Sequence, residues 1–247
     1  IATTLAVGFV PTASASDVTP ARGTSTDAFV QGMTPTISDE FNGTDLDTKI
    51  WSIRDGYRVK GDKGTYSKDM VEVSNGTLKL NTLRYDEADE TGSWGKSAEI
   101  STKGKVAYPY YYMETRIKDT GYGWNGVYNM MSSYDLDLPK RGEFDWREAF
   151  NETVPGSGTF TGDASFFDDK FQTLAHYSTR AGGGNSGQDF HSSARNTWHK
   201  YGVLKSTDGV VFYLDGVEVD RVDATDPAYA TTFAKGQEMH TNISAQV

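Results

Sequence analysis

The 247-residue sequence contains no cysteine, which excludes a disulfide framework and a thiolate metal site. Its four histidines are scattered and show no metal-ligand spacing. Acidic residues outnumber basic ones, 34 to 24, and no stripe of Lys or Arg is present to neutralise phosphates, so we expect no nucleic-acid partner. No segment approaches the roughly 18 consecutive apolar residues of a membrane span. No stretch sustains a helical apolar period, which favours an all-β fold.

The two ends of the sequence differ from its middle. Residues 1–16 combine an apolar run with an Ala-x-Ala site near Ala15, which is typical of the end of a secretory signal peptide. The alternative is an N-terminal strand of the fold. Residues 17–36 are predicted to be a polar linker, and residues 37–247 to be the main domain. The signal-peptide pattern predicts a secreted, extracellular protein. We also expect the protein to act as a monomer.

Glycine, tyrosine and phenylalanine are abundant, and short alternating runs between turn residues favour strands. Two hairpins are the clearest, around Asn75-Gly76 and around Asp215-Gly216. The glycine-rich segment 182–187 is expected to be a flexible loop. Many short strands on one continuous chain predict a two-sheet antiparallel sandwich. Besides the hairpins, the strand candidates are residues 97–102, 110–118, 126–132, 143–149, 171–178 and 198–205.

The segment Gly142–Glu148 carries three acids at the spacing Glu-x-Asp-x-x-Glu among large apolar side chains. A buried strand rarely carries carboxylates, because an unpaired charge away from water is costly. Cleavage of a glycosidic bond needs two nearby carboxyl groups in different environments, one as nucleophile and one as proton donor. The motif therefore makes Glu143, Asp145 and Glu148 the candidate catalytic residues.

Strand alternation places Glu143, Asp145 and Arg147 on one face, and the two aromatic residues between them on the other. Glu148 is out of phase with the first two acids. A one-residue bulge after Asp145 would return it to their face, and bulges are common beside active sites. Without the bulge, Glu148 points at the core and the catalytic interpretation weakens.

Several further motifs occur in a characteristic order: Ser38-Asp39-Glu40-Phe41-Asn42-Gly43, Asn75-Gly76-Thr77-Leu78-Lys79-Leu80, Ala98-Glu99-Ile100-Ser101-Thr102-Lys103-Gly104, Tyr112-Met113-Glu114-Thr115-Arg116-Ile117-Lys118 and Trp198-His199-Lys200-Tyr201-Gly202-Val203. Together with the acidic motif, they make the chain similar to glycoside hydrolase family 16, the secreted retaining endo-β-glycanases, over most of residues 37–246. The resemblance implies a β-jelly-roll with an open substrate cleft and a polysaccharide substrate. It also implies that Glu143 is the nucleophile, Glu148 the general acid/base and Asp145 the residue that tunes the nucleophile.

The resemblance further suggests residues that bind the substrate. Trp124 and Tyr128 fit sugar-stacking positions. His176 and Glu99 would line the cleft, the alternative for His176 being a core histidine. Trp94 either stacks on a sugar or belongs to the core. Arg147 departs from the family pattern; it would meet an acidic substrate group or, equally well, form a surface salt bridge to Glu114 or another acid.

No cofactor is required by this chemistry. The resemblance allows a structural calcium ion near Glu40, whose usual carboxylate partner would follow Val247. The final strands of the family are likewise expected beyond that residue.

Two polysaccharide classes remain open. The net charge of −10 disfavours a densely sulfated polymer, and the motifs place a neutral β-1,3- or β-1,3(1,4)-glucan first. An agar- or carrageenan-type galactan is the alternative if a local basic patch forms in the cleft. Two alternatives belong to other functional classes. One is a non-catalytic glycan-binding sandwich, and the other is a polysaccharide lyase that would use Tyr177, His176 and Arg180. The side chains that would form the basic patch are Arg54, Arg58, Lys60 and Arg147.

Overall fold

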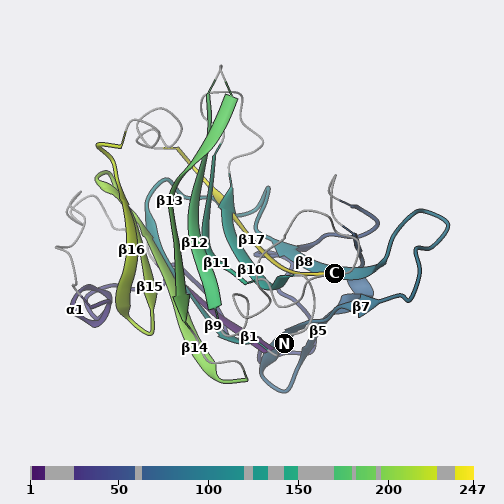
Figure 1. Cartoon of the computed structure of the whole chain (residues 1–247). Helices are drawn as coiled ribbons and strands as arrows, with labels where there is room; N and C mark the ends of the chain where they lie inside the picture. The colour runs from purple at the N-terminus through teal and green to yellow at the C-terminus, as the bar shows by residue number, and fades with distance from the viewer. Residues whose placement is uncertain are drawn as a thin grey trace.

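The computed structural model describes residues 2–8, 25–58, 63–119, 125–132, 142–149, 170–179, 182–192, 196–226 and 237–247. Its strands form two sheets, with β14 and β9 in one and β12, β11 and β10 in the other (Figure 1). Nearly all pairings are antiparallel, the exception being β4 beside β8. The predicted all-β sandwich is confirmed.

Sheet A has the strand order β16-β15-β14-β9-β1-β6-β5, with β2 paired to β1. Its strands are β1 (Ala2–Gly8), β2 (Ile37–Asp39), β5 (Val71–Ser74), β6 (Thr77–Leu80), β9 (Tyr111–Lys118), β14 (Trp198–Lys205), β15 (Gly209–Leu214) and β16 (Val217–Asp223).

Sheet B has the strand order β13-β12-β11-β10-β17-β8-β3, with β4 and β7 paired to β8. The described residues also include one short α-helix, α1 (Asp27–Val30), and a 3-10 turn, η1 (Lys68–Met70). The strands of sheet B are β3 (Ser52–Ile53), β4 (Thr65–Tyr66), β7 (Leu83–Arg84), β8 (Gly95–Ser101), β10 (Asn125–Ser132), β11 (Gly142–Glu148), β12 (Lys170–Thr179), β13 (Gly182–Ser192) and β17 (His240–Gln246).

Both predicted hairpins are present. Asn75 and Gly76 join β5 to β6 with φ values of 54° and 69°, and Asp215 and Gly216 join β15 to β16 with φ values of 49° and 83°. Two positive φ values in a row are what a tight two-residue hairpin requires, and Asn-Gly and Asp-Gly tolerate them best. The glycine-rich segment was predicted wrongly as a loop: it begins β13, which pairs along the whole of β12.

The space between the sheets is filled by apolar side chains from both. Sheet B contributes Phe144 and Trp146 of β11 and Ile243 of β17, all 0 % exposed. Sheet A contributes Val203 and Phe212, which are equally buried. These residues occupy alternate strand positions, so the alternation in the sequence identifies the interior face of each sheet.

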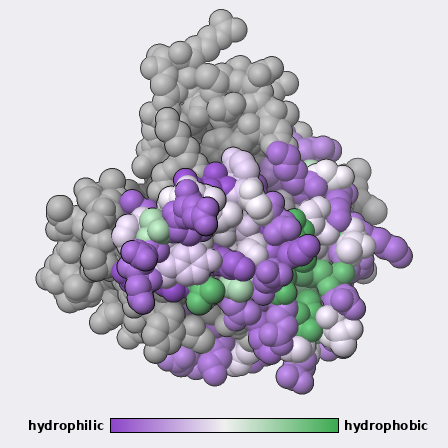
Figure 2. Space-filling view, turned by 90° about the vertical axis from the view of Figure 1, so that its right-hand side faces the viewer, coloured by the Kyte–Doolittle hydropathy of each residue, from purple (hydrophilic) through white to green (hydrophobic). Residues whose placement is uncertain are grey.

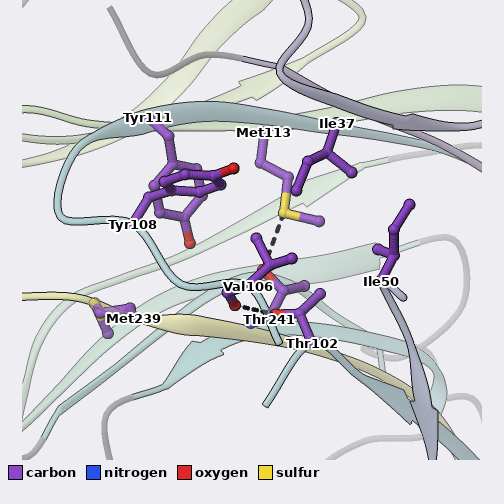
Figure 3. Close-up of a pocket in the computed structure, with 9 residues that line it drawn as sticks. All are labelled: Ile37, Ile50, Thr102, Val106, Tyr108, Tyr111, Met113, Met239 and Thr241. Atoms are coloured by element: carbon purple, nitrogen blue, oxygen red, sulfur yellow. Dashed lines mark hydrogen bonds between the residues drawn. The ribbon is translucent and has the colours of Figure 1, made fainter. Parts of the chain in front are cut away.

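A small apolar cavity remains between the sheets (Figure 3). Met113 lines it from sheet A, and Thr241 from sheet B. The Thr241 hydroxyl donates to the Met113 sulfur at 3.1 Å, while the Thr241 amide donates to the Thr102 hydroxyl at 2.9 Å. Sugars need several polar partners, so this cavity is a packing feature of the interior and not a sugar site. The other lining residues are Ile37, Ile50, Val106, Tyr108, Tyr111 and Met239.

The N-terminal residues take part in sheet A. Ala2–Gly8 form β1 between β9 and β6, as the strand alternative expects, and the signal peptide stays a prediction. Part of the expected linker is also structured: α1 packs on sheet A, where the Phe29 ring lies 5.5 Å from that of Tyr112. Polarity alone gives no signal for this contact, which is made by the apolar side chains of Phe29, Val30 and Met33.

Figure 2 shows the side of the molecule on which β7 and β8 lie, a mostly hydrophilic surface with a small group of apolar side chains. The large apolar residues exposed within the described chain are Ile53, Tyr57, Leu83 and Val217. No helix in the described ranges is both long and apolar enough to cross a membrane.

Candidate active site

The acidic motif lies on β11, between β10 and β12 in sheet B. Asp145 lies opposite Leu174 of β12, and Glu148 lies opposite Gln172. Three steps along β11 therefore match two steps along β12, and the pairing with β10 shifts at the same place. One extra residue on one strand of an antiparallel pair is a β-bulge. The predicted bulge after Asp145 is present.

The bulge brings the three acids to the same face. Glu143, Asp145 and Glu148 lie opposite residues 176, 174 and 172 of β12, which are alternate positions and so share a face. Phe144 and Trp146 fill the interior, which leaves the acids on the opposite side, here called the outer face of sheet B. Asp145 stands between the two glutamates, as an assisting residue for a nucleophile requires.

The acids are shielded although they lie on the outer face. Glu143 is 7 % exposed and Asp145 0 %, while Glu148 is partly exposed. Charges that are shielded from water interact more strongly with a reacting group than exposed ones do. The arrangement therefore suits a pair of carboxyl groups that act on a bound glycosidic bond.

Arg147 points the other way, and the prediction that it shares the face of Glu143 and Asp145 is wrong. Its side chain is 2 % exposed and donates to the carboxylate of Asp119, just after β9 of sheet A. The guanidinium carbon lies 5.2 Å from the ring centroid of Tyr201, which belongs to the interior core. Arg147 thus spans the interior and is no candidate for contact with the substrate.

The electrostatic setting of Arg147 agrees with this position. Burial acts to lower the pKa of Arg147, but the negative charge of Asp119 acts against it, and the pKa is raised above its ordinary value. The guanidinium is therefore charged inside the protein. Of the two alternatives for Arg147, an ion pair with an acid is the one found, although it is buried and not at the surface.

A polar row crosses the outer face of sheet B. Glu99 of β8 lies opposite Ser244 of β17, and Ser244 lies opposite Tyr128 of β10. Tyr128 precedes Asn129, which pairs with Arg147, so the row runs toward Glu148. With strands about 4.8 Å apart, Glu99 lies roughly 14 Å from β11 along this row. The register therefore places Glu99 on the face of the acids and puts Tyr128 opposite Ser244; that these residues bind the substrate stays a prediction.

Arg54 ends this row. Its Nε atom lies 2.9 Å from the Glu99 carboxylate, and its backbone amide donates to the Glu99 carbonyl at 3.0 Å. The guanidinium carbon lies 4.9 Å from the ring centroid of Tyr57 and 5.5 Å from that of Tyr66. The side chain is 29 % exposed, so it presents part of a fixed donor group to solvent.

The three described cations of the galactan hypothesis, Arg54, Arg58 and Arg147, do not converge. Arg54 lies on the outer face and Arg147 in the interior. Arg58 donates to the carbonyls of Gly92 and Thr91 at 2.6 and 3.2 Å, and Lys60 lies outside the described residues.

The remaining predicted substrate contacts are placed as follows. His176 lies opposite Glu143 in the pairing of β12 with β11. Trp94 is half-buried before the start of β8, about 16 Å along the strand from Glu99, and the structure does not bring it to the acids. Trp124 lies outside the described residues.

Glu40 is exposed and accepts a hydrogen bond from the Ser38 hydroxyl at 2.9 Å. Within the part of the chain that is described, no three His, Asp or Glu residues gather as a metal site would require. The calcium ion stays a prediction.

Sequence reasoning missed β17, which supplies a central part of the outer face. His240, Asn242 and Ser244 are 8 %, 5 % and 1 % exposed, and the last two lie opposite Ser101 and Glu99. The signal was available: Asn-Ile-Ser-Ala-Gln-Val, residues 242–247, alternates polar and apolar residues, which predicts a strand with one polar face.

Comparison with known proteins decides the family. A family model described as "Beta-porphyranase A-D, GH16 domain" matches residues 32–247. The chain belongs to glycoside hydrolase family 16. The predicted enzyme class, an O-glycosyl hydrolase, is confirmed, and the retaining mechanism is general in this family.

Individual relatives carry two kinds of name. The chain is 28 % identical over 217 residues to Glucan endo-1,3-beta-glucosidase A1 of Niallia circulans, covering 78 % of this chain and 30 % of that protein. It is 27 % identical over 153 residues to Beta-porphyranase D of Zobellia galactanivorans, covering 59 % of this chain and 35 % of that protein. This family 16 chain thus spans about a third of the length of both relatives.

Solved structures support the fold. The laminarinase from Flavobacterium sp. UMI-01 superposes with a TM-score of 0.65 and 22 % identity, over 84 % of this chain and 86 % of that one. The family 16 endo-glucanase from Bacteroides ovatus gives a TM-score of 0.64 at 20 % identity, over 85 % of both chains. The predicted β-jelly-roll is confirmed.

Proposed function

We propose that this family 16 domain is an endo-acting β-glycanase in which Glu143 is the nucleophile, Glu148 the general acid/base and Asp145 the residue that orients Glu143. The observation that carries the proposal is the bulge, because it places the two glutamates on one face with Asp145 between them. A non-catalytic glycan-binding sandwich has no need for this arrangement.

The reaction proceeds by double displacement. The Glu143 carboxylate attacks the anomeric carbon, and the carboxyl group of Glu148 gives its proton to the leaving glycosidic oxygen. The bond between that carbon and oxygen breaks, and a covalent glycosyl–Glu143 ester forms. Glu148, now a carboxylate, takes a proton from water; the water oxygen attacks the anomeric carbon and releases Glu143. Two inversions give net retention.

For the substrate we propose porphyran, an agar-type galactan, which raises the galactan alternative to first place. The match of residues 32–247 to a porphyranase family model supports this choice. Arg54 adds a partly exposed donor on the outer face, held between two tyrosines and the Glu99 carboxylate. A fixed guanidinium suits the hydroxyl or acidic oxygens of a polysaccharide chain.

A neutral β-1,3- or β-1,3(1,4)-glucan is the second candidate. It is favoured by the relative named as a glucan endo-1,3-β-glucosidase, which aligns with 78 % of this chain. It is also favoured by the net charge of −10 and by the absence of a convergent cluster among the described cations.

Product analysis on porphyran, agarose, carrageenan, laminarin and mixed-linkage glucan tests the proposal. We expect short oligosaccharides from porphyran first, and loss of nearly all turnover in the Glu143→Ala variant. Activity on laminarin alone would select the glucan. Binding without cleavage would favour the glycan-binding alternative, and a product with a new double bond absorbing in the ultraviolet would favour a lyase.

We also propose that the protein is exported, needs no cofactor and acts as a monomer. The Ala-x-Ala sequence before Ser16 supports export, whereas β1 integrates the same segment into sheet A. Two measurements distinguish a signal peptide from a structural strand: N-terminal sequencing of the exported protein, and thermal unfolding of a variant that lacks residues 1–16. A mature chain that starts near Ser16 and unfolds at an unchanged temperature supports a signal peptide. A large loss of stability on deletion supports a structural strand.

A further inference from the structure

The bulge has a consequence for the residues inside it. Thr173 of β12 stands between the partners of Asp145 and Glu148, so it alone opposes both Trp146 and Arg147. All three side chains are in the interior, at 0 %, 0 % and 1 % exposure. A bulge that returns Glu148 to the outer face therefore requires that Arg147 turn inward together with Trp146.

An arginine inside a sandwich is stable only if its charge is compensated. Asp119 supplies the compensation from sheet A, and its side chain is 7 % exposed. Tyr201 of β14 lies under the guanidinium, and its ring packs edge-on against Phe171 of β12 at 5.1 Å between centroids. The ion pair thus joins the bulge of sheet B to the end of β9 in sheet A.

The regular strand without a bulge is the competing arrangement. There, strict alternation would put Arg147 on the outer face, in contact with water, and would turn Glu148 toward the interior. An arginine that lacks a buried partner favours this arrangement, because it recovers its hydration. A buried partner favours the bulge instead.

We propose that the Arg147–Asp119 ion pair is a positioning device that selects the bulged register of β11 and thereby places Glu148 on the outer face. The inference rests on the proposed role of Glu148 as proton donor. Arg147 and Asp119 do not touch the substrate; they act through the strand that carries the donor. Removing Asp119 alone should displace Glu148, whereas replacing both charges by apolar residues should leave residue 147 inside and the bulge intact.

The test uses two substrates that differ in how much they need a proton donor. Polysaccharide cleavage needs the proton from Glu148, whereas an activated aryl glycoside with a dinitrophenolate leaving group departs without it. Loss of the donor therefore lowers kcat/KM on the polysaccharide far more than on the aryl glycoside, because kcat/KM reports the first displacement, before Glu148 acts as a base on water. A loss of folded protein lowers both rates equally.

We expect Asp119→Leu to lower kcat/KM on the polysaccharide on the order of 10²-fold, as a displaced catalytic group does, with kcat/KM for the aryl glycoside within about threefold of wild type. The double variant Arg147→Met/Asp119→Leu should recover most of this kcat/KM. If Asp119→Leu does not fold, Asp119→Asn, which keeps the shape but removes the charge, should show the same split at a smaller size.

Glu218→Leu is the matched control. Glu218 forms a similarly buried pair with Arg221 at 2.7 Å, with side chains 9 % and 7 % exposed, but both residues belong to β16 of sheet A, so this pair does not join the two sheets. It should lose stability without any split between the two substrates. Glu148→Ala is the reference for a missing donor.

Three results would overturn the inference while the proposed function stands. They are an equal loss of kcat/KM on both substrates in the Asp119 variants, no loss on either substrate, and no recovery in the double variant. If Glu148→Ala itself shows no split, the assignment of the proton donor fails and the inference fails with it.

Discussion

Among the described residues, two arginine–carboxylate pairs lie on opposite faces of sheet B, and their settings are opposite. Arg147 and Asp119 meet in the interior with side chains 2 % and 7 % exposed. Arg54 and Glu99 meet on the outer face, where the arginine is 29 % exposed and the glutamate 5 %. The first pair joins the two sheets, whereas the second stays within sheet B and its β3 edge.

The comparison shows that the position of an arginine, and not its presence beside an acidic motif, decides what it does. Arg147 is next to Glu148 in sequence, yet the bulge turns it away from the acids. Arg54 is distant in sequence, yet the pairing of β3 with β8 brings it to their face. An interior pair is expected to govern stability, and an outer pair to govern binding.

The largest expected difference is in stability. Arg147→Ala leaves the Asp119 carboxylate buried without its cation, which should lower the free energy of unfolding by about 3–5 kcal/mol. Arg54→Ala also removes the cation beside a shielded carboxylate, but the space of the 29 % exposed Arg54 side chain opens to solvent, so water can solvate Glu99 and the cost should stay at about 1 kcal/mol, the magnitude for a solvent-screened pair. Urea unfolding of both variants measures the difference; equal costs would break the comparison.

Lys205, a buried cation with no carboxylate beside it among the described residues, sharpens the contrast with Arg147. The Lys205 Nζ atom donates to the carbonyls of Pro109 and Gln237 at 2.6 and 3.0 Å, and burial lowers the pKa of Lys205 to about 7. In the unfolded chain Lys205 has its ordinary pKa of 10.5. Between pH 7 and pH 10.5 the unfolded chain therefore binds more protons than the folded protein, and the free energy of unfolding rises with pH.

Wild type should therefore gain about 2–3 kcal/mol relative to Lys205→Met between pH 7 and pH 9. Unfolding free energies of both proteins at the two pH values test this. A difference that does not change with pH would mean that Lys205 keeps an ordinary pKa in the folded protein.

The smallest expected effect is on binding. Arg54→Ala should raise KM for the polysaccharide roughly tenfold, equivalent to about 1.4 kcal/mol, with little change in kcat, because a contact remote from the bond cleaved acts in the ground state and the transition state alike. Arg58→Ala is the matched control: its guanidinium is held by loop carbonyls, so KM should not change. If steady-state kinetics give an unaltered KM in both variants, Arg54 does not contribute to substrate binding.

Much of the fold was predictable because its signals are local. Alternation located most strands, and Asn-Gly and Asp-Gly located the turns of two hairpins. The position of the bulge also followed from the spacing of Asp145 and Glu148. The direction of Arg147 did not, because strict alternation was applied across a bulge that breaks it; the same bulge that returns Glu148 to the outer face sends Arg147 inward.

Other features depend on contacts between distant segments and have no local signal. Nothing in the sequence near Arg147 indicates Asp119, which lies on the other sheet. The pairing of Arg54 with Glu99 likewise depends on how β3 docks at the edge of β8. By contrast, β17 had a clear alternating pattern, and the glycines of β13 obscured a strand that long-range pairing imposes.

The central claim is that Glu143 is the nucleophile and Glu148 the proton donor on one face of the bulged strand. Rescue by azide with an activated aryl glycoside tests it most directly, through the anomeric configuration of the glycosyl azide product by proton NMR. The account predicts the α-azide from Glu143→Ala, where azide replaces the nucleophile in a single inversion, and the β-azide from Glu148→Ala, where azide attacks the covalent intermediate. The reverse assignment of the two products, or no rescue in either variant, would contradict it.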